Sequence, residues 1–137
     1  MTTPIFNFMG FVAADMAASL AFYRELGLEI PDGAEKEDHV QVTLDNGVTL
    51  AWDKLELIKS IVPDWTQPSG SPRIGLAFQC ESPADVDRVY AAMTAADGSY
   101  AGTSPWDAFW SQRYASLTDP DGNSVDLYAW LPGAQPD

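Results

Sequence analysis

The sequence predicts an α+β fold made of two similar modules, and three observations support this prediction. Each half of the chain begins with a β-rich run, continues with an amphipathic helical pattern and ends with a hairpin-like pair of β-rich runs. A segment rich in Pro, Gly and Ser separates the halves. No glycine-rich phosphate loop follows a strand, which argues against a nucleotide-binding fold. We expect two βαβββ modules, at about residues 4–62 and 72–131, joined by a linker at about 63–71. Their curved mixed sheets would surround one cleft in a single domain, residues 1–137.

The first half is predicted to contain a strand, a helix and a hairpin. Residues 5–13 alternate loosely and are rich in Phe and Val, which is typical of a strand. Asp15 is a helix-capping residue, and apolar residues at helical spacing continue to Leu26. Gly27 suits the left-handed position that ends a helix. The runs 40–44 and 48–52 are joined by Asp-Asn-Gly, which predicts a hairpin, and a short helix is expected after it.

The second half repeats this order. Residues 73–80 predict a strand. Ser82 is a second helix cap, and Pro83 takes the first helical position, where its missing N–H is not needed. This helix is expected to end near Gly98. Two strands follow, at 110–118 and 123–130, joined by the turn Asp-Pro-Asp-Gly. The halves therefore resemble each other in element order.

Composition limits the classes of function. The chain has 137 residues and a net charge of −13, from 20 acidic and 7 basic residues. Nucleic acid and anionic membrane surfaces both attract clustered Lys and Arg, so neither is an expected partner. No apolar run approaches the ~18 residues of a membrane span. No basic residue precedes Arg24, so a signal peptide is not expected, and we expect a cytoplasmic protein.

The chain offers few residues for nucleophilic or metal chemistry. Its one cysteine, Cys80, lies in an apolar run, which predicts a buried thiol. Its one histidine, His39, opens a predicted strand, and we interpret it as a surface or edge residue; a catalytic base is the alternative. No motif pairs a Ser or Cys with a histidine, as nucleophilic catalysis requires.

Two segments resemble a known superfamily. The resemblance is carried by DMAASLAFYRELGLEI (15–30) and WSQRYASLTDPDGNSVDLYAW (110–130). Through them the chain resembles the vicinal-oxygen-chelate superfamily of glyoxalases, extradiol dioxygenases and bleomycin-resistance proteins. The resemblance covers about residues 5–131. The segments LAWD (50–53) and PWDAFWSQRYASLTDPDGNSVDLYAW (105–130) are most similar to the mitomycin-resistance branch of antibiotic-binding proteins. The resemblance implies a homodimer, with modules exchanged between two chains.

The resemblance also implies where the metal-dependent members hold their metal. Their two His ligands and one Glu ligand correspond to Phe8, Arg73 and Asp126. A phenyl ring has no donor atom and a guanidinium has no lone pair, so Asp126 alone can ligate. We therefore expect a cleft without a metal or other cofactor. Arg73 is expected to pair with Asp126 or to bond a ligand at the floor of this cleft.

Strand alternation, combined with the resemblance, predicts which side chains fill the cleft. Side chains two residues apart on a strand share a face. The predicted aromatic lining is Phe8, Trp52, Trp106, Trp110, Tyr114 and Tyr128. The predicted polar contacts are Arg73, Gln112, Ser116 and Asp126. Rings beside a few polar groups favour a planar aromatic ligand, although each ring alone also fits a core or a dimer interface.

The leading interpretation is a binding protein rather than an enzyme. It would sequester a planar aromatic natural product and so give resistance to an antibiotic. One alternative is a metal-independent enzyme that uses Arg73, Tyr114 or Asp126 as an acid–base group. A metal-dependent glyoxalase-like or dioxygenase-like enzyme is disfavoured by the missing histidines. A mimic of DNA is disfavoured because the acidic residues are scattered along the chain.

Overall fold

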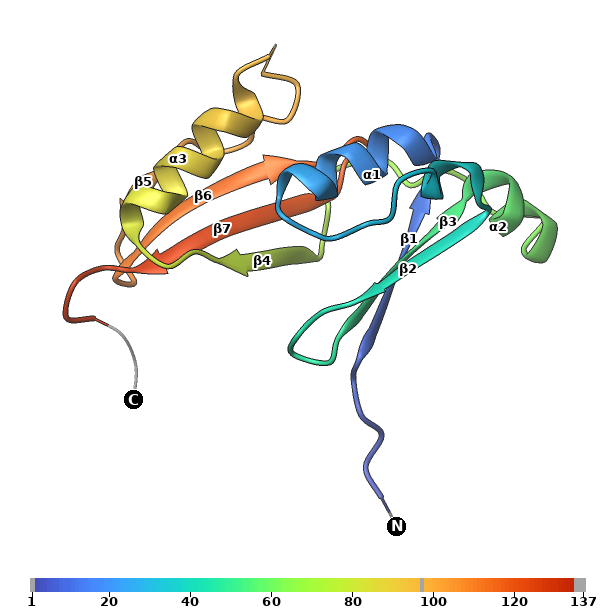
Figure 1. Ribbon diagram of the computed structural model, residues 1–137, viewed down its shortest axis with the longest axis horizontal. Helices are drawn as coiled ribbons and strands as arrows, with labels where there is room; N and C mark the ends of the chain where they lie inside the picture. The colour runs from blue at the N-terminus through green and yellow to red at the C-terminus, as the bar shows by residue number, and fades with distance from the viewer. Residues whose placement is uncertain (1, 97, 135–137) are drawn as a thin grey trace. The chain divides into compact units, whose positions relative to one another are not determined.

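The chain folds into two compact units, residues 1–69 and 70–137. The computed structural model describes residues 2–96 and 98–134. Within these residues each unit contains a mixed sheet and at least one helix (Figure 1), which confirms the α+β class. No helix in the described part of the chain combines the length and the hydropathy needed to cross a membrane.

The first unit is built around the central strand of a three-stranded sheet. Its elements are β1 (Phe8–Ala13), α1 (Met16–Glu25), β2 (His39–Thr43), β3 (Thr49–Lys54) and α2 (Leu55–Ile61). β3 runs parallel to β1 and antiparallel to β2. Asp15 caps α1 by accepting a hydrogen bond from the N–H of Ala18 at 3.1 Å. Gly27, just after the helix, has a φ of +108°, as the predicted helix end requires.

Among its described residues, 2–69, the first unit has three strands, one fewer than a βαβββ module requires. A 3₁₀ turn, η1 (Ala34–Lys36), lies between α1 and β2. Pro31 has no N–H to donate to a strand ladder. Gly33 adopts a φ of +83°, which turns the chain away from an extended conformation. The expected βαβββ order is therefore wrong for this unit, in which β1, α1, β2 and β3 follow one another and α2 comes last.

The second unit has the expected βαβββ order. Its elements are β4 (Gly75–Gln79), α3 (Pro83–Thr94), β5 (Trp106–Ala108), β6 (Gln112–Thr118) and β7 (Ser124–Trp130). The sheet order is β4-β7-β6-β5, with β4 and β7 parallel and the other pairs antiparallel. Ser82 caps α3 by accepting from the N–H of Asp85 at 3.2 Å. The helix ends at Thr94, before the expected Gly98.

Each unit has its own core. In the first unit the rings of Phe11, Tyr23 and Trp52 have centroids 5.3–5.5 Å apart, and neither Tyr23 nor Trp52 is exposed to solvent. In the second unit α3 packs on β6 and β7 (Figure 1), and Val86 of the helix and Val125 of β7 are fully buried. This helix covers one face of the second sheet, and the alternate residues of its strands lie on the other face.

Candidate functional site

The uncovered face of the second sheet gathers most of the predicted binding residues. On β7, Val125 is buried, whereas Asp126 and Tyr128 are half-buried on the opposite face. On β6, Tyr114 lies opposite Tyr128, and Ser116 lies opposite Asp126. We define the aromatic face as Trp106, Trp110, Gln112, Tyr114, Ser116, Asp126 and Tyr128. The structure therefore brings these seven predicted residues together within one unit.

The ring of Trp110 on the aromatic face contacts two other rings of that face. The ring of Trp110 lies 5.5 Å from that of Trp106 and 5.3 Å from that of Tyr114, both in edge-on geometry. Trp106 and Trp110 each remain 40% exposed. The indole N–H of Trp110 donates to Oε1 of Gln112 at 2.8 Å, which fixes the ring. Rings that are held in place but left uncovered can stack on a flat ligand.

The turn that carries Trp110 is held by backbone hydrogen bonds. The N–H of Ser111 donates to the carbonyl of Ala108 at 3.1 Å, and the carbonyl of Ser111 accepts from Leu131 at 3.0 Å. Ser111 has a φ of +69°, a left-handed conformation that few residues other than glycine adopt. Phe109, at the tip, is 89% exposed, and its ring lies 4.8 Å from that of Trp110. The turn thus holds Trp110 beside β6.

Two hydroxyl groups hold the carboxylate of Asp126. Tyr114 donates to Oδ2 at 2.5 Å, and Ser124 donates to Oδ1 at 3.4 Å. Burial, followed by the hydrogen bond to Asp126 and the charge of that carboxylate, raises the pKa of Tyr114 above its ordinary value. The phenol therefore remains a proton donor at neutral pH, and the carboxylate is oriented by two donors.

The expected pairing of Arg73 with Asp126 is wrong. Arg73 is exposed in the bend that precedes β4, and the described residues include no ion pair between it and Asp126. The β4 residue beside this carboxylate is Gly75, where a Cβ atom would lie 3.6 Å from Oδ2. Gly75 lies two residues beyond Arg73 and has no side chain, and the register partner of Asp126 on β4 is Ala77.

The second unit does not fit the metal that the resemblance associates with metal-dependent members. Asp126 supplies oxygen donors that already accept two hydrogen bonds, and neither glycine nor an exposed arginine is a ligand. Among residues 2–96 and 98–134, no group of three or more His, Cys, Asp or Glu is placed to hold a metal ion. Protein metal sites of this kind use at least three such donors.

The two predicted binding residues of the first unit lie on opposite faces of its sheet. Phe8 on β1 is 49% exposed. Trp52 on β3 is fully buried, and its ring lies 5.3 Å from that of Tyr23. The prediction that Trp52 lines a binding surface is therefore wrong. On this strand Asp53, one residue later, lies on the other face because side chains alternate.

His39 is an edge residue, as expected, but it has two partners. Its Nδ1 atom lies 2.5 Å from Oδ1 of Asp53, and its Nε2 atom lies 2.9 Å from Oε1 of Gln41. The hydrogen bonds with Gln41 and then Asp53 raise the pKa of His39 above its ordinary value. Sequence reasoning missed this pair, although the hairpin register, which places His39 opposite Asp53, is the signal that indicates it.

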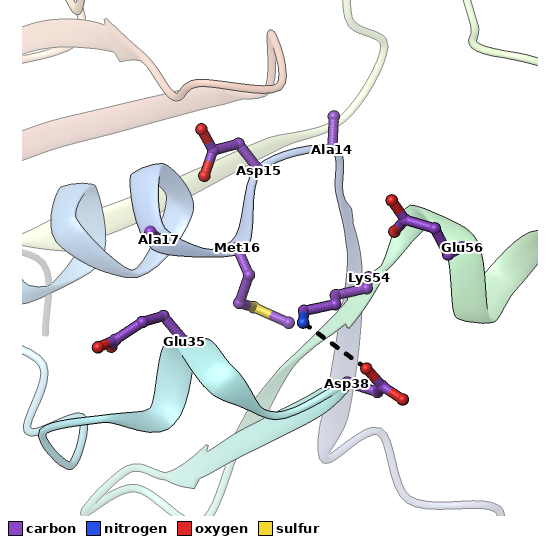
Figure 2. A pocket seen from close by; sticks show the side chains of 8 residues that line it. All are labelled: Ala14, Asp15, Met16, Ala17, Glu35, Asp38, Lys54 and Glu56. Atoms are coloured by element: carbon purple, nitrogen blue, oxygen red, sulfur yellow. Dashed lines mark ion pairs between the residues drawn. The ribbon is translucent and has the colours of Figure 1, made fainter.

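A surface hollow of about 520 Å³ lies elsewhere in the first unit (Figure 2). Figure 2 shows the side chains that line it: Ala14, Asp15, Met16, Ala17, Glu35, Asp38, Lys54 and Glu56. The Nζ atom of Lys54 lies 3.7 Å from Asp38. This lining includes no aromatic ring and none of the predicted binding residues, so the hollow is not suited to stacking.

Two aromatic residues near the aromatic face were not predicted. Trp130 shares the strand phase of Asp126 and Tyr128, and it lies opposite Gln112. Continuing the alternation along β7 by one step would have found it. Phe109 lies in the turn between β5 and β6, where no periodic pattern indicates which way a side chain points.

The chain is similar to members of one family. Residues 5–127 match the Glyoxalase/Bleomycin resistance protein/Dioxygenase superfamily. A solved glyoxalase/bleomycin resistance protein/dioxygenase from Nocardioides is 25% identical, has a TM-score of 0.74, and is aligned over 100% of this chain and 90% of its own. No curated protein matches the sequence.

Two further solved structures share the fold. A glyoxalase/bleomycin resistance protein/dioxygenase family enzyme from Burkholderia phytofirmans PsJN is 16% identical, has a TM-score of 0.75, and covers 92% of this chain and 98% of its own. A glyoxalase/dioxygenase from Nostoc punctiforme is 20% identical, has a TM-score of 0.65, and covers 92% of this chain and 90% of its own. These likenesses extend over almost the whole chain.

Proposed function

The chain belongs to the Glyoxalase/Bleomycin resistance protein/Dioxygenase superfamily, and on this premise we propose that it binds and sequesters a planar aromatic natural product. The ligand would be an antibiotic of the kind bound by mitomycin-resistance proteins, held without a metal or other cofactor. The observation that carries the proposal is the contact of the Trp110 ring with the rings of Trp106 and Tyr114 on an uncovered sheet face. A homodimer is part of the same proposal and rests on family resemblance. A cytoplasmic location is proposed with it.

The aromatic face has the two kinds of group that a flat ligand needs. Each ring stack contributes about 1 kcal/mol beyond the burial of apolar area, so three rings would strengthen binding roughly a hundredfold. Polar groups beside the rings would orient the ligand. Ser116 accepts from the N–H of Thr103 at 2.7 Å, which fixes its Oγ atom and leaves its hydroxyl proton to donate.

Fluorescence titration tests this proposal. Mitomycin, a quinoxaline peptide and bleomycin are added separately, and at least one is expected to quench tryptophan emission saturably. Trp110→Ala should weaken binding of that compound. Trp65→Phe, which changes a tryptophan outside the aromatic face, should leave the affinity unchanged. Mass spectrometry of the released compound should show it unaltered. No saturable response to any of the three compounds would count against sequestration.

A second candidate is a metal-independent enzyme. It is favoured by the hydrogen bond from Tyr114 to Asp126, which presents a protonated phenol next to the rings. Such a phenol can act as a general acid on a bound ligand. Recovery of a chemically altered ligand, at a rate that Tyr114→Phe abolishes, would establish this candidate in place of sequestration.

A further inference from the structure

Asp126 is the one charged side chain among the strand residues on the uncovered face of the second sheet. On β7 the residues of that phase are Ser124, Asp126, Tyr128 and Trp130. Their partners on β6 are Gln112, Tyr114, Ser116 and Thr118, and on β4 they are Gly75, Ala77 and Gln79. None of these partners carries a charge. The described strands therefore provide no positive group to balance this carboxylate.

The arginines of the second unit do not compensate the charge. Arg88 pairs with Asp85 at 3.2 Å. Arg113, whose side chain belongs to the alternate phase of β6, lies 3.0 Å from Asp87 and 3.1 Å from Asp107. Arg73 is exposed ahead of β4. Each arginine of this unit is thus engaged elsewhere or exposed to solvent.

The carboxylate retains the capacity to accept further hydrogen bonds. A carboxylate has about four lone-pair positions, and Tyr114 and Ser124 use one each. Asp126 is half-buried, so an opposite charge beside it would be screened by solvent less than at an exposed site. Gly75 leaves the space next to Oδ2 free of a side chain.

The neighbouring rings also favour a cation. The faces of Trp and Tyr carry negative electrostatic potential, and a cation near such a face is stabilised. Trp106, Trp110 and Tyr114 lie on the same sheet face as Asp126. The net charge of −13 adds a long-range attraction for positive molecules.

We propose that the ligand of the aromatic face is a cation: a planar aromatic molecule with a protonated amine or quaternary nitrogen that pairs with Asp126. This inference rests on the proposed function, because it specifies the charge of the molecule that stacks on the rings. The stacking gives affinity for any flat ring system, and Asp126 selects among flat molecules by charge.

Two compounds of the same shape separate these contributions. N-methylacridinium is a permanent cation, and acridine is its neutral counterpart at a pH above its own pKa. Calorimetric titration of the full chain at low ionic strength should give about tenfold tighter binding of the cation. Added salt should weaken binding of the cation and leave acridine binding unchanged.

Substitution of Asp126 provides the second arm. Asp126→Asn should abolish the preference, so that N-methylacridinium and acridine bind with equal affinity. Glu81→Gln removes the same charge from an exposed residue outside the aromatic face and should preserve the preference. Equal binding of the two compounds by the unmodified chain would overturn this inference and leave the proposed function standing. Binding of neither compound would overturn the proposed function itself.

Discussion

The two units use tryptophan in opposite ways on sheets with similar pairing. In the first unit Trp52 points to the core and is fully buried between Phe11 and Tyr23. In the second unit Trp106 and Trp110 keep 40% of their surface exposed. Both units pair their first strand in parallel with their last strand, as β1 with β3 and β4 with β7.

The polar residues of the units differ as well. In the first unit His39 lies directly opposite Asp53 and contacts it. In the second unit Tyr114 lies opposite Tyr128 and donates instead to Asp126, two residues away along the strand. Sheets with similar strand pairing therefore hold two different hydrogen-bonded carboxylates, Asp53 with a histidine and Asp126 with a tyrosine. The comparison indicates that the rings of the first unit stabilise its core, whereas the tryptophan rings of the second unit remain accessible on its surface.

The largest expected effect is a loss of stability when Trp52 is truncated. Trp52→Ala removes a fully buried ring and should lower the free energy of unfolding by about 3–5 kcal/mol, measured by urea denaturation. Trp52→Phe should cost less, because the buried Nε1 of Trp52 has no hydrogen-bond partner in the described structure. Near-normal stability of the alanine variant would contradict the assignment of Trp52 to the core of the first unit.

Truncation of Trp110 should have the reverse profile. Trp110→Ala removes an exposed ring, so the free energy of unfolding should change by less than about 1 kcal/mol. Affinity for the aromatic ligand should fall about tenfold, because a stacking partner is lost. The two quantities are measured by urea denaturation and calorimetric titration. A large loss of stability with unchanged affinity would assign Trp110 to the core.

Tyr114→Phe tests the hydrogen bond to Asp126. The variant should lose about 1 kcal/mol of stability near neutral pH. Because the pKa of Tyr114 is raised in the folded state, its stabilising contribution is present below the ordinary pKa of tyrosine and is lost as the pH rises through the folded value. The difference between variant and unmodified chain should therefore shrink at high pH. A difference that grows with pH would contradict the assignment.

The smallest effect is expected at His39. Its folded pKa is raised, so the stabilisation from its hydrogen bonds is complete below the ordinary pKa of histidine and is lost as the pH rises through the folded value. Asp53→Asn should lower the pKa of His39, because one acceptor loses its charge. The pair is partly exposed, so the change in stability should be about 0.5 kcal/mol. Proton NMR of the single imidazole measures the pKa directly, and an unchanged value in the variant would exclude Asp53 as a cause.

The sequence predicted those elements whose ends are chemically marked. Asp15 and Ser82 cap the two long helices, and Gly27 ends the first. The strand β5 was missed because three residues are too few to display a period of two. The βαβββ order was expected of the first unit without a residue run for its additional strand, and between α1 and β2 the residues Pro31 and Gly33 favour a turn.

The sheet face of the candidate residues could be predicted where the local pattern and the resemblance agree. Along β7 the apolar phase contains Val125 and Leu127, so Asp126 and Tyr128 fall on the open face by either argument. Along β3 the apolar phase contains Leu50 and Trp52, which indicates the core, yet the resemblance placed Trp52 in a cleft. The local alternation indicates the observed face of Trp52, because burying a large apolar ring is strongly favourable. The resemblance to other chains contains no information on this packing.

Gly75 also has a consequence for the shape of ligands. Phe8 and Gly75 occupy equivalent positions, because each is the first residue of the parallel strand pair of its unit. Phe8 pairs with Thr49, and Gly75 pairs with Ser124. An alanine at residue 75 would fit, because its Cβ atom would lie at ordinary contact distance, 3.6 Å from Asp126. A longer side chain would cover the carboxylate. If the aromatic face binds a ligand as proposed, a larger residue at position 75 would exclude ligands with bulky substituents without altering a ring or a charge.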